Sequence, residues 1–199
     1  MQRQNPSSTD LFQQKSSLRI LQHEPILSSH SAGWKGVLLR HYHLPPHEFS
    51  EYCPQQHVII AHYQQPSSVD RTLDGQKKSL VMGRGEITVV PAHAPHQASW
   101  NEALDLIVLI LNPEFISHVA HEWIDPSQIE LAPHFSNADP FVSQIGSLLK
   151  DALQTSGAES RFYAESMAVA LAAHLIRHYS VKNVAPPNPL GGSIPNVQI

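Results

Sequence analysis

Histidines are the residues of this chain best suited to carry chemistry. The sequence has 14 of them in 199 residues, and seven lie between residues 40 and 100: His41, His43, His47, His57, His62, His93 and His96. Neutral imidazole binds transition metals and makes hydrogen bonds in ligand pockets. Side chains alternate between the two faces of a strand, so His41 and His43 should share a face. His57 and His62, five positions apart, should face opposite ways, and at most one of them is expected to face an interior.

The segments that would position these histidines have the pattern of short β-strands. From Trp34 to Leu111, apolar runs are separated by turn residues and contain no helical segment. They predict strands at Trp34–Leu44, His57–Gln64, Val69–Leu73, Lys78–Met82, Glu86–Val90, Gln97–Trp100 and Leu104–Leu111. Asp74-Gly75 supplies the positive-φ pair of a tight hairpin turn. Residues 34–111 are therefore expected to form an antiparallel sandwich or barrel.

The second half of the chain has helical spacing. Asn112-Pro113 and Asp139-Pro140 each offer an N-cap and a first-turn proline. A last helix over residues 160–180 carries an apolar stripe that either packs in an α-helical hairpin or contacts a second subunit. We assign the stripe to a homodimer interface and residues 112–180 to a helical dimerisation region. The expected interface residues are Ala164, Met167, Ala168, Leu171, Leu175 and Tyr179.

The ends of the chain and its composition limit the functions that are possible. Residues 1–33 form a polar segment that leads into the first strands, and the proline- and glycine-rich residues 181–199 resemble a linker. The net charge is −4 and no basic cluster occurs, which excludes direct nucleic-acid binding by these residues. Cys53 is the single cysteine, so no internal disulfide forms. No apolar run approaches the roughly 20 residues of a membrane helix, so we expect a cytoplasmic protein without membrane contact.

One segment resembles a known motif. GEITVVPAHAPH at residues 85–96 is similar to the second motif of the cupins, small β-barrels of double-stranded β-helix type whose interior holds a metal or small ligand. The resemblance implies an interior position for His96. Two registers fit the first cupin motif, and the metal ligands that they imply are His41, His43, Glu48 and His96, or His47, Glu51, His57 and His96. Pro45-Pro46 interrupts the first register and the second lacks His-x-His, so we expect no metal or other cofactor.

A wider resemblance covers residues 34–180. The segments that carry it are QHVIIAH at 56–62, the hairpin at Leu73-Asp74-Gly75, GRGEITVVPAHAPHQASW at 83–100, LNPEF at 111–115, Asp139-Pro140 and YAESMAVALAAHLIRHYS at 163–180. Together they resemble the amino-terminal half of AraC/XylS-type transcriptional regulators. This resemblance implies a cupin-like barrel that binds a small-molecule effector, followed by helices that mediate dimerisation. DNA would be bound only by a further domain, absent from this chain, beyond the linker.

Three functions follow as hypotheses. We favour the effector-sensing and dimerisation domain of an AraC-type regulator, which is not an enzyme. The first alternative is a metal-dependent cupin enzyme, a dioxygenase or isomerase, in which one of the ligand sets above would hold a divalent transition metal. The second alternative is an assembly domain whose barrel is filled with side chains.

The candidate effector contacts are His57, Arg71, His96 and Trp100. A pocket lined by some of them would suit a sugar, an aromatic acid or a small metabolite. Arg71 shares a strand face with Val69 and Leu73. It would either meet a ligand carboxylate in the barrel or snorkel to solvent from an edge strand, and the second position is expected. Trp100 either walls the pocket or packs in the core with its indole N–H bonded.

Overall fold

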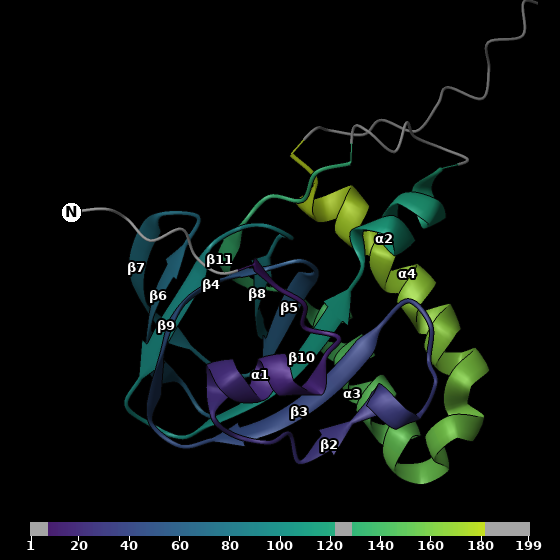
Figure 1. Cartoon of the computed structure of the whole chain (residues 1–199), viewed down its shortest axis with the longest axis horizontal. Helices are drawn as coiled ribbons and strands as arrows, with labels where there is room; N and C mark the ends of the chain where they lie inside the picture. Colours follow the sequence, from purple (N-terminus) through teal and green to yellow (C-terminus); the bar gives the residue numbers. More distant parts are fainter. Residues whose placement is uncertain (1–7, 122–128, 182–199) are drawn as a thin grey trace, which may run out of the picture.

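The chain places two β-sheets face to face, with three helices on one side (Figure 1). The computed structural model describes residues 8–121 and 129–181. The first sheet has the strand order β1 (Ser8–Thr9), β4 (His47–Pro54), β9 (His96–Trp100), β6 (Ser67–Leu73) and β7 (Gln76–Met82). The second has the order β11 (His134–Ala138), β8 (Glu86–Val90), β5 (His57–His62), β10 (Leu104–Leu111), β3 (Leu38–Leu44) and β2 (Leu27–Ser28).

The ladders within both sheets are antiparallel, except that β1 runs parallel to β4. The hairpin between β6 and β7 turns at Asp74 and Gly75, with φ of 49° and 75°. These positive values are the ones that the Asp-Gly pair predicts. The prediction of a mainly β fold of antiparallel sheets with C-terminal helices is confirmed.

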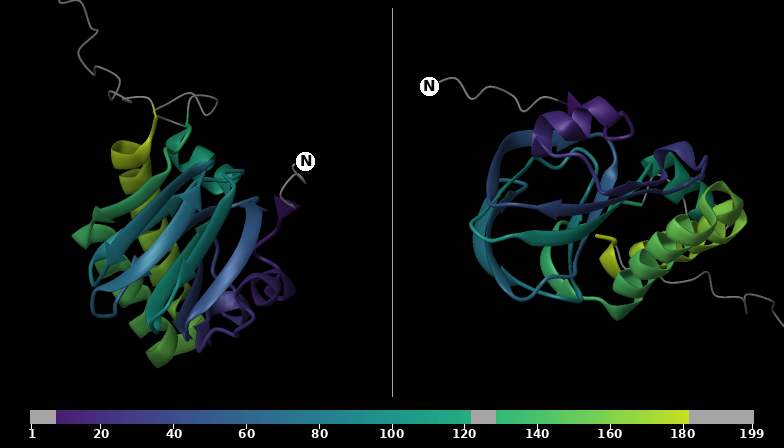
Figure 2. Two further views of the ribbon diagram at one scale, coloured as in Figure 1. Left: turned by 90° about the vertical axis from the view of Figure 1, so that its left-hand side faces the viewer. Right: turned by 90° about the horizontal axis from the view of Figure 1, so that it is seen from below.

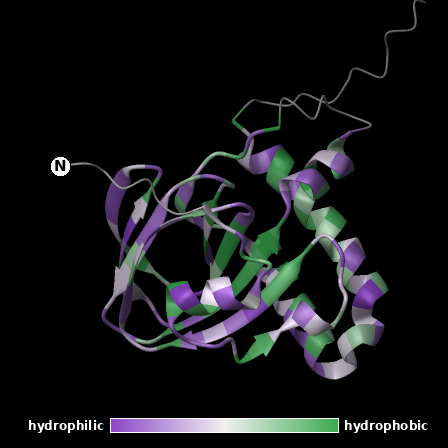
Figure 3. Cartoon of the chain, in the orientation of Figure 1, coloured by the Kyte–Doolittle hydropathy of each residue, from purple (hydrophilic) through white to green (hydrophobic). Residues whose placement is uncertain are grey.

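Both faces of the second sheet are buried, which explains why β5 and β10 are apolar along most of their length (Figure 3). On β10, Leu106 and Ile110 face the first sheet, whereas Ile107 and Leu109 face the helices. Strands with one polar face would alternate, as β6 does. The alternation divides the core into two clusters, one between the sheets and one between the second sheet and the helices.

The helices α2 (Pro113–Ala120), α3 (Pro140–Ser156) and α4 (Arg161–Tyr179) cover the outer face of the second sheet (Figure 2). Asp139 caps α3 by accepting a hydrogen bond of 3.0 Å from the backbone N–H of Val142. A 3₁₀ turn at Gly157–Ser160 joins α3 to α4, and Gly157 has a positive φ of 52°. The two helices pack against each other as a hairpin, one of the two arrangements that the sequence analysis considered.

The N-terminal segment holds regular structure that the sequence reading missed. It contains α1 (Gln14–Leu21), which packs against β4, and a 3₁₀ turn at Ser29–Ser31. No strand was predicted at β4, because Pro45, Pro46 and Pro54 interrupt the apolar pattern there. β4 is the second strand of the first sheet, between the two-residue β1 and β9.

The expectation of a barrel needs correction in one respect. Among the described residues the two sheets do not join into a closed barrel. The edge strands of the first sheet are β1 and β7, and those of the second sheet are β11 and β2. The architecture is a sandwich of two facing sheets. Residues 182–199, which were assigned to a linker, lie outside the described residues.

The stripe assigned to a dimer interface was placed wrongly. Ala164, Ala168, Leu171, Leu175 and Tyr179 are buried within the chain itself, in the cluster between the second sheet and the helices, and Met167 packs against that cluster. The sheet and the neighbouring helices already cover this face of α4. A spacing of three and four residues shows that a helix has an apolar face but does not show what covers it. Dimerisation itself stays a prediction.

No helix in the described ranges combines the length and the apolar character that a membrane span requires.

Candidate functional site

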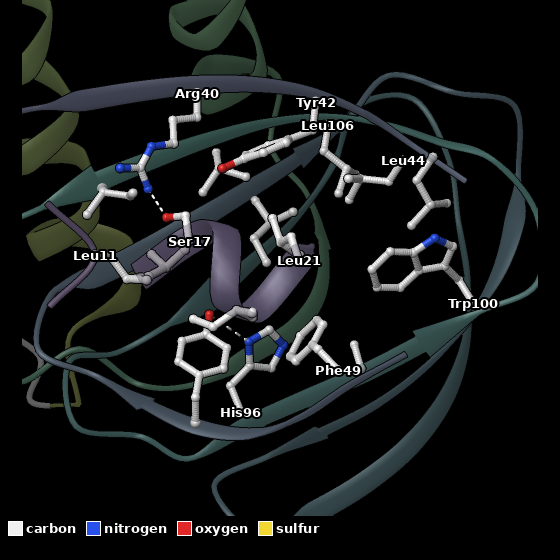
Figure 4. Close-up of a pocket in the computed structure, with 18 of the residues that line it drawn as sticks. Leu11, Ser17, Leu21, Arg40, Tyr42, Leu44, Phe49, His96, Trp100 and Leu106 are labelled. Atoms are coloured by element: carbon white, nitrogen blue, oxygen red, sulfur yellow. Dashed lines mark hydrogen bonds between the residues drawn. The ribbon is translucent and has the colours of Figure 1, made fainter. Parts of the chain in front are cut away.

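A cavity of about 60 Å³ lies between the two sheets, beneath α1 (Figure 4). Most of its wall is apolar or aromatic. The aliphatic part comes from α1, β3, β5 and β10, and Phe49 and Trp100 supply rings from the first sheet. The polar side chains in the wall are Ser17, Arg40, Tyr42, Tyr52, Arg71 and His96. An apolar cavity with a few convergent polar groups is the usual form of a small-molecule site.

Arg71 and His96 form a buried pair on the inner face of the first sheet. Nη1 of Arg71 donates a hydrogen bond of 2.7 Å to Nε2 of His96. Because guanidinium has no acceptor, Nε2 must be the unprotonated ring nitrogen, which assigns the proton to Nδ1. Nδ1 lies 3.4 Å from the Tyr52 hydroxyl oxygen and can donate to it. Arg71, His96 and Tyr52 therefore form one chain of hydrogen bonds.

The charge state of this pair follows from its burial. Desolvation lowers the pKa of His96 well below its ordinary value, and the charge of Arg71 lowers it further. The imidazole is therefore neutral near pH 7. Burial also lowers the pKa of Arg71 to about 10, partly offset by Tyr52, so its guanidinium still carries its charge at neutral pH.

A second buried arginine lies on the opposite wall. Arg40 on β3 donates through Nη1 to the hydroxyl of Ser17 on α1. Tyr42, two residues along the same strand, faces the same cavity. Arg40 and Arg71 expose 1% and 3% of their surface, which is unusual for arginine. The cavity thus has a cation in each of two facing sheets.

Neither cation is paired with an acid. The ion pairs of the described residues are His41–Asp105, Arg161–Glu165 and His174–Asp139, and none includes Arg40 or Arg71. Asp10 is the acid whose charge acts on Arg40, but its carboxylate oxygens accept from Phe12, Gln13 and Gln56 instead. A buried charge without a partner is costly. This cost identifies the cavity as the candidate site.

The structure brings together three of the four residues predicted as effector contacts. Arg71, His96 and Trp100 all line the cavity, and the indole N–H of Trp100 is bonded to the carbonyl of Pro45 at 2.8 Å. The expected snorkelling of Arg71 was wrong, because β6 lies inside the sheet between β7 and β9. A side chain on the inner face of an inner strand has no route to solvent.

His57 does not belong to this site. It lies on the face of β5 that points away from the cavity, and its Nδ1 accepts a hydrogen bond of 3.0 Å from the backbone N–H of Ala92. His62, five positions on, lies on the opposite face, as predicted. Burial lowers the pKa of His57 to about 4 and that of His62 to about 3, so both are neutral at pH 7.

The two implied sets of metal ligands do not converge. On β3, His41 and His43 point away from the cavity that His96 lines. On β4, Glu48 and Glu51 are exposed. Within residues 8–121 and 129–181, no three His, Cys, Asp or Glu side chains are grouped so that they could hold a metal ion.

Several site residues were missed by the sequence reading. Arg40 and Tyr42 alternate with His41 and His43 along β3, and the same alternation that places the histidines outside places these two inside. That signal was available in the sequence. Tyr52 could not have been found in this way, because a register shift in β4 turns the rings of both Phe49 and Tyr52 towards the cavity. Ser17 could not have been found either, because it lies on α1, which was not predicted.

Comparison with known proteins gives similar structures only. No protein-family model and no curated protein matches the chain. A cupin superfamily protein from Desulfitobacterium hafniense is 19% identical, over 39% of this chain and 69% of that one, with a TM-score of 0.34. An RmlC-like cupin from Shewanella frigidimarina is 17% identical, over 38% and 66%, with a TM-score of 0.33. Oxalate decarboxylase from Bacillus subtilis is 13% identical, over 39% and 21%, also with a TM-score of 0.33. With scores this low, the likeness carries no argument about activity.

Proposed function

We propose that this chain is the effector-sensing and dimerisation domain of an AraC-type transcriptional regulator, and that it binds a small molecule in the cavity between its sheets. The observation that supports this proposal most is the cavity itself. Its wall contains the buried and unbonded polar atoms Arg40 Nη2, Tyr42 Oη and Arg71 Nε. Unsatisfied groups of this kind lower stability and are kept where a ligand satisfies them.

The elements around the cavity suit a sensor. α1 supplies Ser17, Ile20 and Leu21 to the wall, so a ligand would contact the N-terminal segment directly. β3, β5 and β10 present alternate residues to the cavity and to the helices on the other side of the sheet. A ligand that repositions the inner residues of these strands would therefore act on the support of α3 and α4.

The outward face of α4 is the surface that we assign to a second copy of the chain. Phe162 is 83% exposed, and Val169, seven residues further along the helix, is also exposed. This face replaces the buried stripe in the proposal. DNA contacts would be made by a further domain, as the resemblance to these regulators implies.

A binding screen with a cavity-filling control tests the sensing function. A ligand of the folded state raises the melting temperature by mass action, so an effector should produce a concentration-dependent rise in a thermal-shift screen of small metabolites. Ala98→Leu fills the cavity from β9 and should abolish that rise. Ser99→Leu, on the outer face of the same strand, is the matched control and should keep it.

Two results would count against the proposal. Equal binding by the Ala98→Leu and Ser99→Leu variants would place the ligand elsewhere. A ligand that binds in the cavity but leaves the monomer–dimer equilibrium in analytical ultracentrifugation unchanged would remove the link between sensing and dimerisation.

A further inference from the structure

We infer that the ligand of this cavity is a small organic monocarboxylate, whose charged head lies between Arg40 and Arg71 and whose apolar body fills the rest of the space. The inference rests on the sensing function proposed above and goes beyond it by naming the chemical class of the effector.

The balance of charge inside the cavity is the first argument. Two guanidinium groups, one on β3 and one on β6, face the same space, and both side chains are more than nine-tenths buried. No aspartate or glutamate lines the cavity. A pair of like charges in an apolar interior is unfavourable unless an anion joins it. An acidic ligand supplies that missing charge.

The free donor atoms give the second argument. Arg71 uses Nη1 for His96 and leaves Nε buried without a partner. Arg40 uses Nη1 for Ser17 and leaves Nη2 in the same state. The Tyr42 hydroxyl lies beside Arg40 and Ser17 but has no partner in good hydrogen-bond geometry. A carboxylate, with two oxygens and several lone pairs, is suited to accept hydrogen bonds from these donors.

The scarcity of acceptors argues against a sugar. Hydroxyl groups of a sugar need acceptors as well as donors, and the cavity wall contains no carboxylate and no side-chain amide. The imidazole of His96 already uses its acceptor for Arg71, and the carbonyl of Pro45 already receives the indole N–H of Trp100. A ligand that mainly accepts hydrogen bonds fits this wall better than a polyol does.

The size and lining of the cavity argue against a phosphate ester. Its volume of about 60 Å³ limits a ligand to a head group and a short body. Phosphate sites usually add backbone N–H groups from a helix N-terminus or a loop, whereas the walls of this cavity are mostly strands whose N–H groups pair within the sheets. Phe49 and Trp100 offer apolar faces for the body of the ligand.

His96 acts here as a positioning residue. Its bond to Nη1 orients the guanidinium of Arg71 and leaves the Nε atom free for a ligand. Because the imidazole is neutral, it orients the cation without supplying the missing negative charge. The Tyr52 hydroxyl in turn accepts a hydrogen bond from Nδ1–H and fixes the plane of the ring.

Matched acid and amide pairs test the inference on the complete chain. The thermal-shift panel contains acetate with acetamide and butanoate with butanamide, together with methyl phosphate and glucose. We expect at least one of the two carboxylates to raise the melting temperature and its amide to bind at least tenfold more weakly. Arg71→Met and Arg40→Met should each reduce binding of that acid at least tenfold. Arg177→Met, an exposed arginine on α4, is the control and should leave it unchanged.

The stability of the variants without ligand separates a binding role from a structural one. Methionine in place of an unpaired buried arginine removes a desolvated charge, so Arg71→Met should keep or raise the melting temperature while acid binding is lost. A large fall in melting temperature, with acid binding retained by the folded fraction, would overturn the inference. The ¹⁵N–¹H signal of Arg71 Nε gives an independent readout, and it should shift on addition of the acid.

The panel also separates this inference from the proposed function. Binding of glucose or of the amides alone would overturn the carboxylate assignment and leave the sensing function in place. Binding of methyl phosphate without the carboxylates would overturn it in the same way. A panel in which nothing binds, neutral or charged, would count against both.

Discussion

Nη1 of Arg71 lies 2.7 Å from Nε2 of His96, and both side chains are almost completely buried on the inner face of the first sheet. The two residues are diagonal neighbours in the β6–β9 ladder, where Leu73 pairs with His96 and Arg71 with Ala98. A charged donor is thus held by a neutral acceptor in an apolar wall. This pair is the part of the site most open to mutational test.

Removing the acceptor should lower stability. His96→Leu leaves another donor of a buried guanidinium unbonded, so we expect the free energy of unfolding to fall by about 1.5–3 kcal/mol, the range for hydrogen bonds to charged groups. His96→Gln keeps an acceptor oxygen and should cost less. Urea denaturation followed by circular dichroism measures both. In the double variant with Arg71→Met no charge is left unpaired, so the loss should be smaller than the sum of the single losses, and strict additivity would argue against the coupling.

Acidification should begin to destabilise the fold below about pH 6.5, before most carboxylates are protonated. Burial lowers the pKa of His57 to about 4, that of His62 to about 3, and that of His96 well below its ordinary value of 6.5. Below pH 6.5 the unfolded chain binds protons that the folded chain excludes. The free energy of unfolding should therefore fall as the pH falls towards about 4, by up to about 1.4 kcal/mol per pH unit for each histidine.

Denaturation at stepped pH values checks this dependence. His57→Gln keeps an acceptor for the N–H of Ala92 and removes one titrating group, so its stability should depend less steeply on pH. Equal free energies of unfolding at pH 6.5 and pH 5 would contradict the burial of these imidazoles.

Asp139 should be the residue that secures the C-terminal end of α4 to the start of α3. Its carboxylate accepts hydrogen bonds from the Tyr179 hydroxyl at 2.6 Å, from His174 Nε2 at 2.8 Å and from the N–H of Val142. Asp139→Ala removes the helix cap and leaves the Tyr179 hydroxyl short of a partner. The expected loss is about 2–4 kcal/mol of unfolding free energy.

Protonation of Asp139 at low pH should lower the free energy of unfolding. Burial alone would raise the pKa of Asp139, but the bonds from Tyr179, Val142 and His174 outweigh it and the pKa lies below its ordinary value. The stabilisation is therefore present above the unfolded-state pKa near 4 and is lost as the pH falls through the lower folded-state value. Asp139→Asn should retain the cap and lose this dependence, which denaturation at pH 3 and pH 6 would measure.

Charge placed on the buried stripe of α4 should unfold the chain rather than separate subunits. Leu171 and Leu175 are fully buried against the second sheet and its helices. Leu171→Ala should cost about 2–5 kcal/mol, and Leu171→Asp combined with Leu175→Asp should abolish the folded circular dichroism spectrum. Val169→Asp, on the exposed face of the same helix, is the control for stability. A folded monomer from the double variant, seen by light scattering, would restore the stripe as a subunit interface.

Much of the local structure could be predicted from the sequence, because it depends on neighbours in the chain. Glu86–Val90 and Leu104–Leu111 were predicted with the bounds that β8 and β10 have. The hairpin at Asp74-Gly75 and the helix starts at Pro113 and Pro140 follow from φ preferences, and Asp139 also caps the second helix, whereas Asn112 makes no side-chain cap bond at the first. These features need only the residues that form them, which is why they were found.

The site depended on contacts that no local pattern contains. The sequence placed Arg71 on the face of Val69 and Leu73, but only the strand order puts β6 between β7 and β9 and so denies the guanidinium a route to water. Arg40 meets Ser17 across 23 residues of sequence, and the register shift in β4 turns Phe49 and Tyr52 to the same side. The apolar stripe of α4 is equally visible in the sequence, yet only packing decided that the sheet covers it. Periodicity determines which faces are apolar, whereas the partner of each face and the burial of each charge are decided when distant segments meet.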